Sequence, residues 1–247
     1  MSGPSARPGR ATPRRTDADG AGTGTAAGAG PSDTRTKIVL AAERLFAERG
    51  IAAVPLRDIV TAAGQRNASA IQYHFGPRPD LVTAVFQYRM GQINERRLEH
   101  LAQVYASGRA ADPRTLVEAL VRPLVEAVGE PGCHYARFLA QLSASPNYRV
   151  SDSWQIASSL RAVREGLQRA LDHLPAEVYA ERWRMVTHLF IHTIADHEKD
   201  DSHPPRTEWA TRLIDACVAV LTAPLEQPPP PRAPRTGDGE PRPEPVG

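Results

Sequence analysis

Apolar residues recur about every 3.6 positions through nearly all of residues 34–223, which is the spacing of one face of an α-helix. No stretch alternates with a period of two over five residues, so no β-sheet is predicted. The chain is therefore predicted to be all-α. Its helical body of about 190 residues is long enough for one large or two small hydrophobic cores.

Proline and glycine gather at the two ends of this body. Residues 1–33 hold 4 Pro and 7 Gly, and residues 224–247 hold 9 Pro and 3 Gly. Segments of this composition bury too little apolar surface to fold, so both ends are predicted to be disordered tails. Whether the proline-rich tail docks on a partner is left open by its composition.

Several classes of protein are excluded by what the chain lacks. Its two cysteines, Cys133 and Cys217, cannot form a disulfide framework or a four-thiolate zinc site. It has no run of 18 apolar residues and no apolar signal core, so a cytoplasmic protein without membrane contact is expected. The sequence motifs of serine hydrolases, P-loop proteins and zinc proteases are absent, and no cofactor or metal is predicted.

The first predicted helix covers residues 34–49. Ser32 or Asp33 is expected to cap its start, and Gly50 supplies the left-handed residue that ends it. The apolar stripe on its inward face consists of Ile38, Ala41, Ala42, Leu45 and Phe46.

Two shorter helices are predicted to follow. The first begins after Pro55, covers residues 56–63 and ends at Gly64. The second covers residues 68–75, with Asn67 as its cap. A short helix, a tight turn and a second short polar helix make a helix-turn-helix, the unit that lays its second helix in the major groove of DNA.

The second of these helices has two unlike sides. Ile71 and Phe75 face inward and seat it, and hydrogen-bonding residues that can read base edges lie on the other side. These residues are Asn67, Ser69, Gln72 and Tyr73.

Charge is uneven along the body. Residues 34–90 carry eight basic and four acidic side chains, a net charge of +4, whereas the residues from 91 onward carry −3. A polyanion is expected to bind at the basic end, residues 34–90. A composition with 28 Arg could also produce this uneven charge by chance. Six longer helices are predicted to follow, over residues 79–106, 113–128, 133–144, 151–173, 175–199 and 207–222.

The strings AAERLFAERG, LRDIVTAAG and IQYHFGPRPDL together resemble the DNA-binding domain of TetR-type transcriptional regulators over residues 34–82. That family places Tyr-His-Phe near the end of its recognition helix and a basic residue just after it. Beyond residue 90 the resemblance is architectural, because the family adds a helical domain that binds a small effector and dimerises. It implies a DNA-binding domain at 34–78 and an effector-binding and dimerisation domain at 79–223.

The resemblance implies roles for individual residues. Arg57 would reach a base or a phosphate, Gln72 would meet bases, and Arg78 would contact phosphate. Packing of Tyr73 in the core, of His74 at the helix junction, or pairing of Arg57 with Asp58 are the structural alternatives. The full set of implied DNA contacts is Arg57, Arg66, Asn67, Ala68, Ser69, Gln72, Tyr73, His74 and Arg78.

Two features depart from the family pattern. Val54-Pro55 stands where members commonly have a Thr or Ser that caps the second helix, so that hydroxyl contact is expected to be missing. The turn at Gln65-Arg66-Asn67 is one residue longer than the commonest spacing, which could shift the assignments of Arg66, Asn67 and Ala68 by one.

The second domain offers candidate sites without a decision between them. Its central aromatics could line an apolar effector cavity, with His134 or Gln141 as orienting polar groups, or could be ordinary core. His188, His192 and Asp196 lie at i, i+4 and i+8 and could hold a metal or form a polar seam between subunits. The aromatics in question are Tyr105, Tyr135, Phe138, Trp154 and Trp183.

From the resemblance we predict a homodimeric transcriptional regulator that binds double-stranded DNA and is not an enzyme. Most members of the family are repressors that a small-molecule effector releases from a near-palindromic operator. Two alternatives remain: a metal-dependent hydrolase built on His188, His192 and Asp196, and a helical scaffold without DNA binding. The effector, the operator and the regulated genes cannot be named from the sequence.

Overall fold

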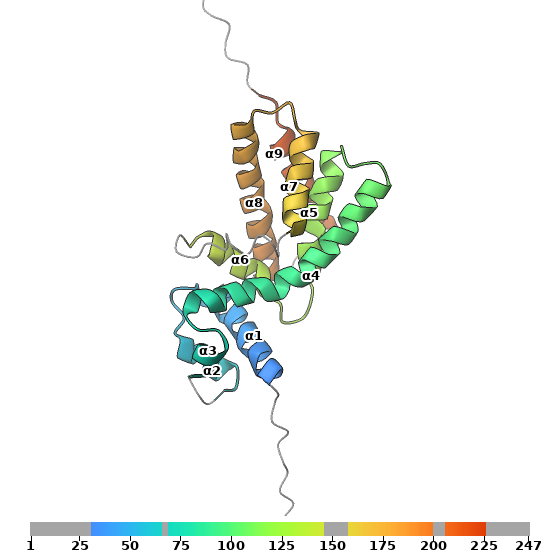
Figure 1. Ribbon diagram of the computed structural model, residues 1–247. Helices are drawn as coiled ribbons and strands as arrows, with labels where there is room; N and C mark the ends of the chain where they lie inside the picture. Colours follow the sequence, from blue (N-terminus) through green and yellow to red (C-terminus); the bar gives the residue numbers. More distant parts are fainter. Residues whose placement is uncertain (1–30, 66–68, 146–157, 200–205, 226–247) are drawn as a thin grey trace, which may run out of the picture.

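The computed structural model describes residues 31–65, 69–145, 158–199 and 206–225. Within these residues it has nine α-helices and no strand, which confirms the predicted all-α class (Figure 1). The predicted tails lie outside the described residues, apart from a few positions at their inner ends. The helices are α1 (Pro31–Arg49), α2 (Leu56–Ala62), α3 (Ser69–His74), α4 (Arg78–Ala106), α5 (Pro113–Ala127), α6 (Tyr135–Ser143), α7 (Ser158–Ala170), α8 (Ala176–Lys199) and α9 (Arg206–Thr222).

α1 begins at Pro31, three residues before the predicted start. Proline is favoured in a first turn because the N–H that it lacks would have no helical partner there. Ser32 and Asp33 therefore lie inside the helix and not at the N-cap position predicted for them. Asp33 instead accepts a hydrogen bond from Lys37 Nζ at 2.7 Å. Gly50 ends the helix with φ 86°, as predicted.

α2 packs against α1, and α3 packs against α2. Their apolar sides are buried at Ile59, Val60 and Ile71, as the helical spacing predicted. Gly64 has φ 68° in the turn that follows α2, a conformation that residues with a Cβ rarely adopt. Pro55 stands at the start of α2 without a side-chain cap, as predicted for this departure from the family pattern.

α4 joins the two parts of the molecule. Its 29 residues span roughly 43 Å at the rise of an α-helix. It starts beside α3, crosses α1 and continues to α5 and α7 (Figure 1). One continuous helix thus connects the helix-turn-helix to the far side of the helical body.

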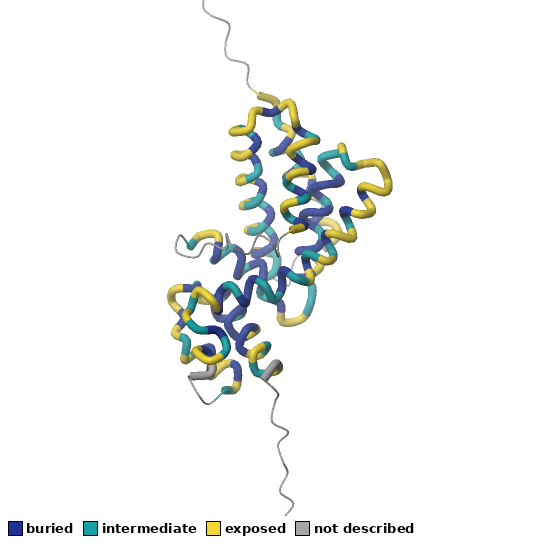
Figure 2. The backbone as a smooth tube through the Cα atoms, viewed as in Figure 1, coloured by how far each residue is buried: buried dark blue, intermediate teal, exposed yellow. Residues whose placement is uncertain are grey.

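α6 makes a second connection, because it packs against both α1 and α8. α5, α8 and α9 pack against one another behind it. The buried side chains of all these helices form one continuous hydrophobic cluster. Figure 2 colours the backbone dark blue at the buried positions. A close-packed interior of this kind transmits a shift of one helix to its neighbours.

Two of the predicted longer helices are shorter in the structure by more than one residue. α6 covers Tyr135–Ser143 where 133–144 was predicted, and α7 ends at Ala170 where the prediction ran to 173. The chain turns after α7 because Pro175 follows, and the residue before a proline disfavours helical geometry. Residues 151–157 of the predicted helix lie outside the described residues.

The described residues also bear on the membrane-spanning and cysteine-based classes of protein that the sequence excludes. None of them is both long and apolar enough to cross a bilayer. Cys133 and Cys217 are buried free thiols, and burial raises their pKa values to about 11 and about 12. They are therefore core residues without nucleophilic character at neutral pH.

Candidate nucleic-acid interface

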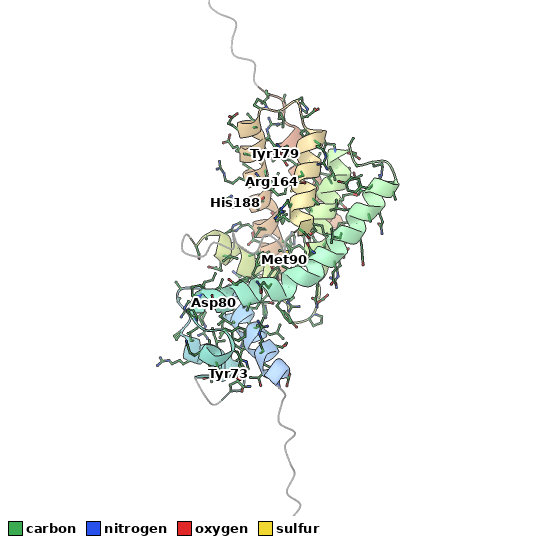
Figure 3. All side chains as sticks on the ribbon, in the orientation of Figure 1. Tyr73, Asp80, Met90, Arg164, Tyr179 and His188 are labelled. Atoms are coloured by element: carbon green, nitrogen blue, oxygen red, sulfur yellow. The ribbon has the colours of Figure 1, made fainter. Side chains whose placement is uncertain are left out.

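α3 presents a polar edge to the outside of the molecule. Ile71 and Phe75 are buried against the other helices, with exposed fractions of 1% and 9%. Gln72 and Tyr73 lie on the opposite side and are exposed, Tyr73 to 84%. Figure 3 shows Tyr73 at the end of the molecule farthest from α9. This excludes the alternative in which Tyr73 packs in the core.

His74 lies between the exposed edge and the core. It is half-buried, and its ring meets the Tyr73 ring edge-on with centroids 5.0 Å apart. Its centroid lies 6.2 Å from that of Phe75, and Phe75 carries the Arg35 guanidinium 5.0 Å above its ring. The aromatic residues at the end of α3 therefore form a connected group that orients the exposed Tyr73.

Arg57 projects from α2 into solvent. Its side chain is 84% exposed, and its Nε lies 3.7 Å from Asp58 Oδ1. Asp58 also accepts a hydrogen bond from Arg49 at 3.3 Å. Exposed ion pairs of this kind are worth about 1 kcal/mol or less, so the pairing leaves Arg57 able to bind another anion.

Arg78 begins α4 and has a partner within the chain. One terminal nitrogen donates a hydrogen bond of 2.7 Å to the carbonyl oxygen of Ile51, in the turn after α1. A guanidinium carries five N–H donors, so this bond leaves others for a phosphate. Arg78 therefore fixes the start of α4 against the helix-turn-helix, a role that the sequence did not predict.

The remaining predicted DNA contacts surround the turn before α3. Arg66, Asn67 and Ala68 lie outside the described residues, and their assigned roles stay predictions. Ser69 is the first residue of α3.

An ionic cluster that is buried at Glu43 and Arg89 joins α1, α4 and the segment between α5 and α6. Glu43 is fully buried and accepts from Arg89 Nε at 2.9 Å. Arg89 also lies 3.6 Å from Glu130, which pairs with Arg96 at 2.7 Å. The burial of Glu43 could have been predicted from the sequence, because Val39, Glu43 and Ala47 recur at the spacing of one buried helix face.

The N-terminus of α6 is held by carboxylates from two other helices. Glu43 accepts from the backbone N–H of His134 at 2.8 Å. Glu198 of α8 accepts from those of Ala136 and Arg137 at 3.1 and 3.0 Å. Burial raises the pKa of Glu198 although these hydrogen bonds oppose the shift. Because free N–H groups at a helix start favour negative charge, the two carboxylates fasten α6 to α1 and to α8.

His134, predicted as an orienting group of an effector cavity, lies at this junction. Its Nδ1 accepts from Arg137 at 2.7 Å, and it lines a hollow of about 720 Å³ together with Arg44 and Gln65. Burial and, next, the charge of Arg137 lower its pKa. This hollow opens between α1, the turn after α2 and Gly132.

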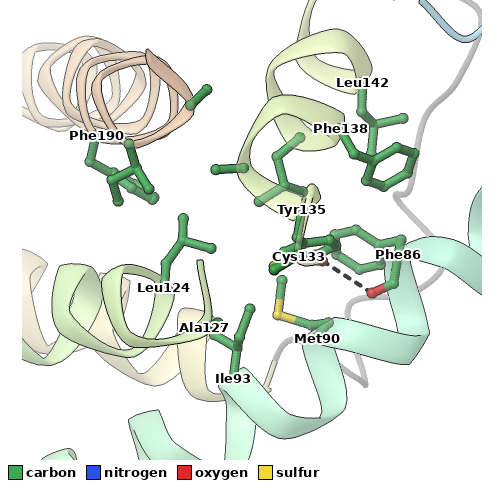
Figure 4. Packing of buried hydrophobic residues seen from close by; sticks show 14 of the residues in the cluster. Phe86, Met90, Ile93, Leu124, Ala127, Cys133, Tyr135, Phe138, Leu142 and Phe190 are labelled. Carbon is green, nitrogen blue, oxygen red and sulfur yellow. Dashed lines mark hydrogen bonds between the residues drawn. The ribbon is translucent and has the colours of Figure 1, made fainter. Parts of the chain in front are cut away.

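The structure brings two of the five predicted effector residues together. The Tyr135 hydroxyl donates to the Phe86 carbonyl at 3.1 Å, and its ring stacks on Phe138 with centroids 5.9 Å apart (Figure 4). Both rings are fully buried. Burial raises the pKa of Tyr135 well above its ordinary value, so its hydroxyl stays protonated. These two aromatics are packed as core.

The other predicted effector residues do not join this pair. Tyr105 lies nineteen residues after Phe86 on α4, roughly 28 Å along the helix, and is 48% exposed beside Arg169. Trp183 is half-buried on α8, with the Arg164 guanidinium 6.0 Å from its ring. Trp154 lies outside the described residues.

His188, His192 and Asp196 lie along the exposed side of α8. The two imidazole rings have centroids 6.2 Å apart, and His192 Nε2 lies 3.5 Å from Ser143 Oγ. In the described parts of the chain no three His, Cys, Asp or Glu side chains are placed to hold a metal ion. The site that the hydrolase alternative needs is therefore not formed by these residues.

A helix-turn-helix with an exposed polar second helix, attached through α4 to a larger helical body, is the architecture of a transcriptional regulator. Residues 38–85 match the sequence model of the tetR family of bacterial regulatory proteins, and residues 118–223 match that of the tetracyclin repressor-like C-terminal domain. The chain belongs to the TetR family, whose members regulate transcription and are not enzymes.

Curated relatives match over part of their length. The HTH-type transcriptional regulator TtgR of Pseudomonas putida is 37% identical over 81 residues, which are 33% of this chain and 36% of TtgR. The HTH-type transcriptional repressor KstR2 of Rhodococcus jostii is 34% identical over 97 residues, 39% of this chain and 44% of KstR2. The chain spans less than half the length of these relatives.

Solved structures share the fold over most of the chain. A tetR family transcription regulator from Shewanella sp. PV-4 has a TM-score of 0.55 at 18% identity and covers 76% of this chain and 95% of its own. AmtR of Mycobacterium smegmatis has a TM-score of 0.53 at 20% identity, and the match covers 82% of this chain and 91% of AmtR. At these identities the likeness establishes the fold.

Proposed function

We propose that this protein is a homodimeric, sequence-specific DNA-binding regulator, a repressor that a small organic effector releases from a near-palindromic operator in the cytoplasm. Residues 34–78 would bind DNA, and residues 79–223 would bind the effector and dimerise. The observation that carries the proposal is the polar edge of α3, where Gln72 and Tyr73 are exposed opposite the buried Ile71 and Phe75.

The chemistry of this edge suits a DNA groove. A glutamine amide offers one donor and one acceptor, which match the N6 and N7 edge of adenine in the major groove. The Tyr73 hydroxyl and the exposed Arg57 guanidinium suit phosphate oxygens, which set the position of the protein without reading sequence. We assign base reading to Gln72 and backbone contact to Arg57, Tyr73, His74 and Arg78.

The outward side of α8 supports the proposed dimer. Met185 is 50% exposed there, and His188 and His192 are exposed one and two turns further on. A second copy packed about a two-fold axis would cover these side chains. It would also place two α3 helices one turn of DNA apart, roughly 34–36 Å.

α4 and α6 supply the coupling that release requires. Both touch α1 and the helical body, and the buried Glu43 bonds to residues of both connections, Arg89 and His134. An effector that binds one arrangement of these helices more tightly would change the separation of the two α3 helices. Its differential affinity for the two arrangements limits the size of that effect.

The proposal is tested by selecting bound sites from random double-stranded DNA with the purified full chain. A near-palindromic consensus is the expected result. Gln72→Ala should then weaken binding to that consensus by about 1–3 kcal/mol and relax the preference at one base position. Gln103→Ala, which removes an exposed glutamine near the far end of α4, is the matched control and should change nothing.

Arg57→Ala gives the contrasting result. Loss of a phosphate contact should weaken binding to all sequences alike. It should also reduce the slope of log binding constant against log salt concentration by about one. If Gln72→Ala lost the same binding affinity for consensus and for random DNA, its base-reading role would be contradicted. Recovery of no enriched sequence, at any salt concentration, would favour the helical scaffold instead.

A further inference from the structure

Arg97 is a buried cation in the middle of α4, where α4, α5 and α7 pack together. Only 3% of the residue is exposed. One terminal nitrogen donates to Ser159 Oγ at 3.2 Å and the other to the Leu120 carbonyl at 3.3 Å. Its Nε has no hydrogen-bond partner among the described residues.

The partners of Arg97 are all neutral. In the described parts of the chain no carboxylate lies within ion-pair distance of its guanidinium, in contrast to Arg89 on the same helix. Burial lowers the pKa of Arg97 to about 10, so it is still charged at neutral pH. A buried charge without a counter-charge is costly, and native proteins seldom keep one without a use.

The first turn of α7 adds positive character at the same place. Ser159 is the second residue of this helix, and its backbone N–H donates to Asn94 Oδ1 at 2.9 Å. Asn94 also accepts from Ser158 Oγ at 3.3 Å. The N-terminal end of a helix carries partial positive charge. Among the described residues, no negative group lies between the guanidinium and this helix start.

We propose that Arg97, together with Ser159 and the first turn of α7, binds the carboxylate of an organic anion, and that this anion is the effector. The inference rests on the proposed function, since it names the chemical class of that effector. Two of the five N–H donors of Arg97 are in use, so Nε and a terminal nitrogen are left to bond both oxygens of one carboxylate.

The surroundings define the rest of the ligand. Ile93 and Leu101 lie one turn to either side of Arg97 on α4, and both are buried, as is Leu120 on α5. A ligand bound at the guanidinium would lie beside these apolar side chains, which favours an apolar body. This selects a carboxylate with a hydrocarbon portion over a fully hydrated oxyanion such as phosphate.

Binding would act on the contacts that hold α4. A carboxylate on the free donors would lie beside the hydrogen bonds to Ser159 Oγ and the Leu120 carbonyl, which tie α4 to α7 and α5. α4 continues to Arg78, which bonds to Ile51 in the helix-turn-helix. An anion added at Arg97 would thus change the restraints on the helix that leads to α3.

The test is a thermal-shift titration of the full chain with benzoate, octanoate, phosphate and sulfate, and with benzyl alcohol and octanol as neutral analogues of the carboxylates. Benzoate or octanoate is expected to raise the Tm of the wild type, with weaker or no effect of the two inorganic oxyanions and the alcohols. Arg97→Met should weaken the binding of that carboxylate by at least about tenfold. Arg96→Met, which removes a half-exposed arginine at the neighbouring position of α4, should leave the response unchanged.

Operator binding, measured in the same samples, separates this inference from the function on which it rests. Release of a selected operator by the carboxylate, from the wild type and not from Arg97→Met, is the expected result. No shift with either carboxylate, or equal shifts in Arg97→Met and the wild type, overturns the anion site even if the operator is bound. If a carboxylate raised the Tm only when Arg97 is present, but the protein bound no DNA, the anion site would stand and the proposed regulatory function would be wrong.

Discussion

Two buried arginines on one helix, eight residues apart, have opposite surroundings. Arg89 and Arg97 have exposed fractions of 9% and 3%. Arg89 meets Glu43 and Glu130, whereas Arg97 meets one hydroxyl and one backbone carbonyl. The first environment is complete without a ligand, and the second lacks a negative charge among the residues that the structure describes. The comparison separates a structural charge from one available to a partner.

The pKa values differ in the same way. Burial lowers the pKa of both groups, but the hydrogen bond and charge of Glu43 more than offset this for Arg89, so its pKa lies above the ordinary value. Arg97 has no such partner in the described ranges, and its pKa falls to about 10. The same side chain on one helix is therefore stabilised as a cation at one position and destabilised at the other.

Removal of the paired arginine should have the largest effect. Arg89→Met leaves Glu43 as an unpaired buried charge, which typically costs about 3–5 kcal/mol. We expect the free energy of unfolding, measured by urea titration of the full chain, to fall by that amount.

Two further variants sharpen this result. Adding Glu43→Gln to Arg89→Met removes the stranded charge and should recover part of the loss. Arg96→Met breaks only the half-exposed pair with Glu130 and should cost about 1 kcal/mol or less. If Arg89→Met and Arg96→Met proved equally mild, Glu43 would not depend on Arg89 for its burial.

Removal of the unpaired arginine should have a smaller effect of the opposite sign. Arg97→Met replaces an uncompensated charge by an apolar side chain of similar length. Its hydrogen bonds to Ser159 and Leu120 are lost, but the burial cost disappears with them. We expect the free energy of unfolding without ligand to stay unchanged or to rise by up to about 2 kcal/mol.

A loss as large as that of Arg89→Met would break the comparison. It would mean that the two neutral acceptors are enough to make Arg97 a structural residue, and the case for an anion would weaken. Arg97→Lys keeps a charge but offers no fork of N–H donors, so it should not gain stability.

The smallest effect concerns pH and the junction at α6. Burial and the Arg137 charge lower the pKa of His134 in the folded protein, so the folded state binds its proton less readily than the unfolded chain. The stability that this gives is present above the unfolded pKa of about 6.5 and is lost as pH falls through the folded pKa. Between pH 7.5 and pH 5, Tm should therefore fall more in the wild type than in His134→Asn.

The difference between the two proteins isolates His134, because the nearby carboxylates are the same in both. His173→Asn, at an exposed histidine after α7, should follow the wild type. An equal fall in Tm for the wild type and His134→Asn would show that His134 does not couple the junction to protonation.

Local features of the helix-turn-helix could be predicted because they depend on neighbours in sequence. The inward side of α3 followed from the spacing of Ile71 and Phe75, and the end of α1 from Gly50. The exposure of Tyr73 followed from the same spacing. The start of α1 was missed, because Pro31 was assigned by composition to the tail.

Contacts between distant positions could not be predicted in this way. Glu43 and Glu198 were available as charges in the sequence, yet nothing local indicated that both would bind the start of α6. For the same reason the sequence could not show that Tyr105 and Tyr135, which were proposed together for an effector cavity, lie on different parts of the body.

By itself, therefore, the sequence determined the helices, the helix-turn-helix and the polar edge that it exposes, because each depends on residues within a few turns of one another. Only the tertiary structure decided which charges are paired. Arg89 and Arg97 are alike in sequence terms, and the difference between them comes from whether α1 and α7 bring a carboxylate or a hydroxyl to the guanidinium. Electrostatic energy depends on distance in space, which the order of residues does not specify.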